Sequence, residues 1–167
     1  PNGLEVDKIR FWSYDEPNNQ FITPQLYSLG DLIVSSIKDE NGNLTLNYQD
    51  RLGRTVAIRT GGDESMLQAI DPESTWATTY YIYDLFGRPV HIIQPEGVKL
   101  LSGQNWDLNA NNLLNLYAFS YEYDTRGRII QKKVPGAAAE SFVYDKLNRV
   151  VASQDGNLAT QQKWLIT

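Results

Sequence analysis

A short pattern occurs four times along this chain, and this repetition constrains the fold more than any other feature. Each copy has an aromatic strand that ends in Asp, a Gly or Asn three residues later, and then an Arg that leads an apolar run. The copies span residues 48–54, 81–88, 121–128 and 142–149. Self-similarity of this kind indicates a repeat protein, in which neighbouring units bury each other's apolar surfaces. Such arrays typically form surfaces or containers.

The residues of the pattern suit the parts of a β-hairpin. The Asp can open the turn, because its carboxylate can accept a hydrogen bond from the backbone N–H two residues later. Gly, or Asn in its place, tolerates a left-handed backbone, so φ > 0 is expected three residues after the Asp. Every copy is therefore predicted to form a hairpin, with turn-opening residues Asp50, Asp84, Asp124 and Asp145 and left-handed residues Gly53, Gly87, Gly127 and Asn148.

Aromatic residues occur three positions and one position before the Asp. Residues two apart leave an extended strand on the same face, so these rings form one aromatic stripe. The first copy differs, because its only aromatic residue, Tyr48, lies two positions before Asp50 and is expected to face the opposite way. The other copies supply the pairs Tyr81 and Tyr83, Tyr121 and Tyr123, and Phe142 and Tyr144.

The pattern predicts an all-β fold, an antiparallel strip of hairpins with one short helical insertion. We divide the chain into an irregular N-terminal segment at 1–30, with one strand near 9–14, and a hairpin array at 31–167. Apolar residues at helical spacing predict the helix over roughly 106–118. Both ends of the sequence are interpreted as cuts in a longer polypeptide, since it starts at Pro1 without an apolar leader and ends on an apolar run.

Composition argues against several classes of partner. The net charge is −5 and no basic cluster is present, whereas proteins that bind nucleic acid usually carry a clustered basic face. No run approaches the ~20 apolar residues that a membrane-spanning helix needs. The chain has no cysteine, which excludes disulfides and thiolate metal sites. We therefore expect no nucleic-acid partner and no membrane span.

Enzymatic chemistry finds little support in the sequence. His91 is the only histidine and is interpreted as a residue of the second return strand, and no nucleophile elbow or phosphate-binding loop is present. Asp63 with Glu64 and Asp71 with Glu73 are carboxylate pairs in a turn-rich insertion, where such pairs are usually solvated. The sequence therefore predicts a protein that is not an enzyme.

One loop shares part of a calcium-binding pattern. Asp39, Asn41 and Asn43 alternate oxygen-bearing side chains, but Gly42 falls at the fourth position of the loop rather than the sixth, and no Glu lies at the twelfth. Asn-Gly at this point is instead a strong signal for a hairpin turn. We therefore predict no metal and no cofactor.

The recurring Tyr-x-Tyr-Asp-x-x-Gly-Arg makes the chain resemble the YD-repeat family, also called Rhs repeats. The similarity runs from about residue 31 to the end, and linking stretches such as 76–81 and 132–137 resemble the repeat region of very large Rhs proteins of Bacteroidetes-type bacteria. The family's self-cleaving core has no match here, so no catalytic residue is carried over. The resemblance implies that an Arg pairs with the Asp across each turn, at Arg54, Arg88, Arg128 and Arg149.

The resemblance also implies a function and a location. The chain is expected to be a structural segment of a large secreted or cell-surface protein, and to form part of a β-shell or scaffold that can enclose a C-terminal toxin. Its main partner would be the remainder of its own polypeptide. Open strand edges predict weak self-association in addition.

A carbohydrate-binding β-domain is the alternative that the residues leave open. Exposed rings on a sheet can stack on sugars, and Trp12, Trp76 and Trp106 are the candidates. The opposing interpretation is that these rings fill the core, because large aromatic side chains are mostly buried. Exposure of the rings in the folded protein distinguishes the two.

Overall fold

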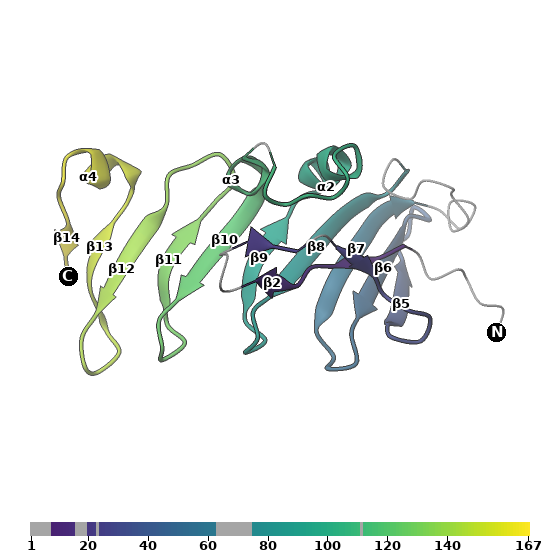
Figure 1. Cartoon of the computed structure of the whole chain (residues 1–167), viewed down its shortest axis with the longest axis horizontal. Helices are drawn as coiled ribbons and strands as arrows, with labels where there is room; N and C mark the ends of the chain where they lie inside the picture. The colour runs from purple at the N-terminus through teal and green to yellow at the C-terminus, as the bar shows by residue number, and fades with distance from the viewer. Residues whose placement is uncertain (1–7, 16–19, 23, 63–74, 111) are drawn as a thin grey trace.

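The computed structural model describes residues 8–15, 20–22, 24–62, 75–110 and 112–167, and it confirms the all-β fold. Ten strands form one antiparallel sheet in which each strand pairs with its neighbours in sequence (Figure 1). The strands are β5 (Ile33–Lys38), β6 (Leu44–Gln49), β7 (Thr55–Gly62), β8 (Ala77–Tyr83), β9 (Pro89–Ile93), β10 (Ala118–Tyr123), β11 (Ile129–Lys133), β12 (Glu140–Tyr144), β13 (Val150–Gln154) and β14 (Leu165–Ile166).

The four predicted hairpins are β6–β7, β8–β9, β10–β11 and β12–β13. Their turns lie side by side along one edge of the sheet, at the bottom of Figure 1. Each hairpin also has a register shift just before its turn, for example between Ile82 and Tyr83. A bulge at this place increases local twist, and the sequence pattern gave no separate sign of it.

The core lies on one face of the sheet, which we call the covered face. A single line of paired residues crosses five strands there, and every member is 0% exposed: Tyr48, Ala57, Tyr80, Ile93 and Ala118. Tyr48 therefore faces away from Tyr81, as the sequence predicts, but the bulge after Ile82 interrupts the alternation, and Tyr83 packs against the same core as Tyr48. Its neighbour in this line on β8 is Tyr80, the residue directly before Tyr81 of the stripe.

The N-terminal segment differs from the single strand that we expected. It contains four two-residue strands in two small sheets, β1 (Arg10–Phe11) with β4 (Gln25–Leu26) and β2 (Tyr14–Asp15) with β3 (Gln20–Phe21). Figure 1 shows this segment crossing the sheet over β7–β9. The Trp12 ring packs edge-on against Tyr80 at 5.2 Å between ring centroids, so the segment closes the core. Because contacts with distant residues hold this segment in place, its own sequence shows little strand periodicity.

The prediction of one helix over 106–118 is wrong in extent and in number. The described residues contain α2 (Pro95–Ser102), α3 (Leu113–Tyr117) and α4 (Gly156–Thr160). Positive φ values at Asn105, Trp106 and Asn112 (53°, 62° and 58°) keep the residues before α3 out of a helix. None of these helices is long and apolar enough to cross a membrane.

Candidate functional site

Each repeat turn is held by its Asp in the way the sequence predicts. In the second hairpin, Asp84 Oδ1 accepts hydrogen bonds from the backbone N–H of Phe86 and of Arg88, both at 2.9 Å. Asp84 Oδ2 accepts from Arg88 Nε at 2.7 Å. Burial alone raises the pKa of Asp84, but its bonds to Arg88 outweigh burial and lower the pKa below the usual range. The carboxylate therefore stays ionised and is fully used by the turn.

The other three turns repeat this geometry. The left-handed position has φ of 77° at Gly53, 77° at Gly87, 78° at Gly127 and 64° at Asn148, which confirms that prediction. The Arg Nε to Asp Oδ2 distance is 2.7 Å for Arg54 with Asp50, 2.7 Å for Arg128 with Asp124 and 2.8 Å for Arg149 with Asp145.

The same arginines also connect one hairpin to the next. The guanidinium of Arg88 stacks on the ring of Tyr123 in the following hairpin, 4.5 Å from the ring centroid. The Tyr123 hydroxyl donates a 2.8 Å hydrogen bond to the carbonyl of Pro89, the residue after Arg88. Equivalent contacts join Arg54 and Thr55 to Tyr83, and Arg128 and Ile129 to Tyr144. We call this series of Asp–Arg pairs and stacked tyrosines the turn ladder.

The last member of the turn ladder differs from the first three. Arg149 pairs with its own Asp, but among the described residues it stacks on no ring. Its side chain is 71% exposed, compared with 31%, 28% and 22% for Arg54, Arg88 and Arg128. Stacking on the next hairpin therefore accounts for the shielding of the first three arginines.

The loop considered for calcium is a further turn of the same kind. Asp39 Oδ1 accepts from the backbone N–H of Asn41 and Asn43 at 3.0 and 2.8 Å, and Oδ2 accepts from Asn43 Nδ2 at 2.9 Å. Gly42 has φ of 85°, like the repeat glycines. Both Asp39 oxygens thus already bind N–H donors, and Asn43 takes the place of the Arg. The hairpin turn predicted here from Asn-Gly is confirmed, and its Asp-x-x-Gly spacing is the same as in the repeat turns.

The tryptophans do not form an exposed sugar-stacking row, so the candidate platform is corrected. Trp12 and Trp76 are only 8% and 3% exposed. Trp106 is half-buried, 6.0 Å from the Tyr80 ring and beneath the Arg10 guanidinium at 4.4 Å. These rings pack in or against the core because the N-terminal segment and the loop before α3 cover the sheet. The carboxylate pairs at 63–64 and 71–73 lie outside the described residues.

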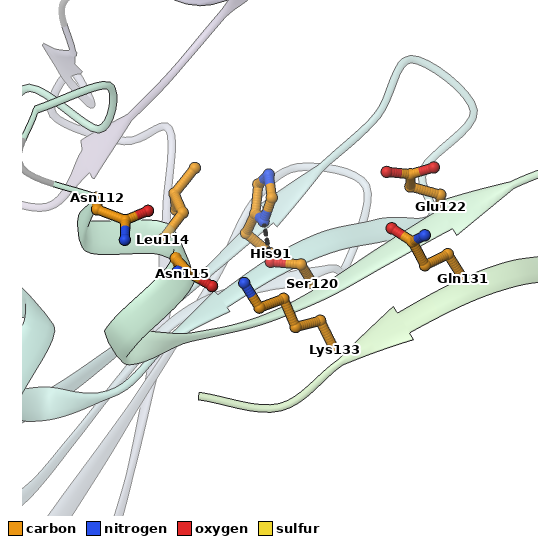
Figure 2. A pocket seen from close by; sticks show the side chains of 8 residues that line it. All are labelled: His91, Asn112, Leu114, Asn115, Ser120, Glu122, Gln131 and Lys133. Carbon is orange, nitrogen blue, oxygen red and sulfur yellow. Dashed lines mark hydrogen bonds between the residues drawn. The ribbon is translucent and has the colours of Figure 1, made fainter. Parts of the chain in front are cut away.

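A pocket of about 310 Å³ lies on the covered face, beside the apolar core (Figure 2). His91, Ser120 and Lys133 are paired across β9, β10 and β11, so their side chains share this face. His91 Nδ1 lies 2.9 Å from Ser120 Oγ, and the Phe21 ring packs against the imidazole at 5.3 Å. Burial lowers the pKa of His91 to about 4, so the imidazole is neutral at pH 7.

A comparison with protein-family models finds no match to this chain, and a comparison with curated proteins finds no relative. Among the described residues, no group of three or more His, Cys, Asp or Glu side chains could hold a metal ion. Two features of the described residues bear on function: the stacking of hairpins through the turn ladder, and the polar pocket beside the core.

Proposed function

We propose that this chain is a structural, non-catalytic segment of a large secreted or cell-surface protein of the Rhs/YD-repeat type. In this role it forms part of a β-shell or scaffold that encloses a C-terminal segment such as a toxin. The observation that carries the proposal is the turn ladder, in which the Arg of one hairpin binds the Tyr of the next. Contacts of this kind add hairpins in a row and need no ligand or active site.

The order of the strands in the sheet supports the same proposal. Among the described residues, each strand of the ten-stranded sheet pairs only with its neighbours in sequence, so the strip has the nearest-neighbour organisation of repeat proteins. The carboxylates of the repeat turns are occupied by N–H donors, which leaves them unsuited to acid–base chemistry. The residues that the pattern repeats are therefore used for folding and stacking.

Limited proteolysis of the complete polypeptide that contains this chain tests the enclosure. We expect the C-terminal segment to resist protease in the wild type and to be cut faster when Arg88→Ala and Arg128→Ala are combined. Arg126→Ala is the matched control, because Arg126 is an exposed turn residue outside the turn ladder. Equal cleavage of the wild type and the double variant would overturn the proposal.

We also propose weak self-association through the outer strands. β5 is exposed along its whole length, and Ile33 and Ile37 are large apolar residues on it. Exposed edge strands pair readily with other chains. Light scattering should therefore detect association at high protein concentration, and Ile37→Lys should reduce it. A strictly monomeric wild type at high concentration contradicts this proposal.

A further inference from the structure

Two adjacent lysines of β11 have very different surroundings. Lys132 pairs with Glu140 at 2.8 Å and stacks on Phe142 at 5.2 Å. Lys133 points to the other face of the strand, is half-buried and has no ion-pair partner among the described residues. A partly buried ammonium loses part of its hydration, and no counter-charge from the described residues offsets this loss. The Lys133 side of the pocket is therefore complementary to an anion.

Polar side chains lie around the end of the Lys133 side chain. Figure 2 shows the Lys133 side chain pointing toward Asn115 of α3 and toward the His91–Ser120 pair. The position of α3 is fixed on this side, because the backbone N–H of Gly136 donates to the carbonyl of Asn115 at 3.0 Å. An ammonium suits a carboxylate, since charge-assisted hydrogen bonds are stronger than those between neutral groups.

The opposite end of the pocket has a different chemistry. Glu122 and Gln131 are paired across β10 and β11, and Figure 2 shows them together, away from the end of the Lys133 side chain. A carboxylate at this end repels a second negative charge but accepts hydrogen bonds from hydroxyl groups. Leu114 adds an apolar wall. A ligand that fits both ends carries its charge on one side and hydroxyls on the other.

We propose that this pocket binds a hydroxylated carboxylate of the size of one acidic sugar residue, with the carboxylate at Lys133 and the hydroxyls at Glu122 and Gln131. The volume of about 310 Å³ lies at the lower end of the range for small-molecule sites. The site uses none of the tryptophans considered for sugar stacking. It is also separate in space from the turn ladder, which lies along the turn edge of the sheet.

Titration with glucuronate, followed by backbone NMR shifts and calorimetry, tests the site. We expect shifts at Ser120 and Asn115, and weaker shifts with glucose, which lacks the carboxylate. Lys133→Gln should weaken glucuronate binding by about tenfold or more, as loss of a charge-assisted bond implies. Lys132→Gln removes the same charge from the opposite face and should leave the affinity within about twofold.

Three results would overturn the proposal. The first is the absence of shifts around the pocket with glucuronate. The second is equal affinity for glucose and glucuronate, which would remove the carboxylate from the recognition. The third is an equal effect of Lys133→Gln and Lys132→Gln, which would show non-specific attraction to the net charge. Circular dichroism of both variants controls for folding, and acetate controls for binding of any carboxylate.

Discussion

Arg88→Ala is the perturbation that most directly tests how the hairpins are held together. It removes the pair with Asp84, whose side chains are only 28% and 19% exposed, and the stack on Tyr123. A partly shielded surface ion pair contributes roughly 0.5–1 kcal/mol, and a cation–π contact at such a site a similar amount. The expected loss in the free energy of unfolding is therefore about 1–2 kcal/mol.

Hydrogen exchange read by mass spectrometry suits this test, because repeat arrays can open locally. Arg88→Ala should increase exchange in both β8–β9 and β10–β11, since the arginine belongs to one hairpin and contacts the other. Arg126→Ala, in the turn of the second of these hairpins, should change the free energy of unfolding by less than about 0.5 kcal/mol. Urea unfolding followed by circular dichroism provides the global value.

A double-mutant cycle isolates the contact between hairpins. Arg88→Ala combined with Tyr123→Leu should show a coupling energy of about 0.5–1 kcal/mol, because both changes remove the same stack. A second cycle combines Arg88→Ala with Tyr123→Phe, which keeps the ring and loses only the hydrogen bond to Pro89. The coupling energy in this cycle should be near zero. The reasoning fails if Arg88→Ala affects only β8–β9, or if the leucine cycle shows no coupling.

Three further changes test single features of the fold. Gly87→Val should cost about 1–2 kcal/mol, because φ is +77° there, while Gly87→Asn should cost clearly less, since Asn148 holds the same position; equal melting temperatures contradict this. Gly62→Ala should cost about 1–3 kcal/mol, because its Cβ would lie 2.4 Å from the Trp76 ring; an unchanged urea midpoint contradicts it. Folding lowers the pKa of His91 from 6.5 to about 4, so as the pH falls the unfolded chain binds a proton at a higher pH than the folded chain does. From pH 7 to pH 4, the free energy of unfolding of the wild type should therefore fall by up to about 3 kcal/mol more than that of His91→Gln. Equal falls for the two proteins, measured by urea unfolding at each pH, contradict this.

Local chemistry explains which parts of the fold could be predicted from the sequence. The turn residues act within five positions of one another, so the Asp, the left-handed residue and the Arg fix the hairpin wherever they occur. The orientation of Tyr48 opposite to that of Tyr81 follows from the two-residue period of a strand, whereas the bulge before Tyr83 interrupts this period. These features need no knowledge of the rest of the chain.

Features that depend on distant contacts were missed. Trp12 contacts Tyr80 because the N-terminal segment crosses the sheet, and no periodic pattern in the segment predicts this crossing. The helical spacing before α3 was real, but left-handed backbone at Asn105, Trp106 and Asn112 interrupts it. The pocket could not be predicted either, since it brings together β9, β10, β11 and α3.

The change in character along the covered face connects the two proposals. Over β6–β9 this face carries the buried line from Tyr48 to Ile93, because the N-terminal segment excludes water there. At β10 and β11 the paired residues become His91 with Ser120, Ser120 with Lys133, and Glu122 with Gln131. A strip that served only as a wall would need no half-buried lysine at this boundary that has no ion-pair partner among the described residues. The turn ladder holds the strands in register on both sides of it, so the scaffold also positions the residues of the pocket.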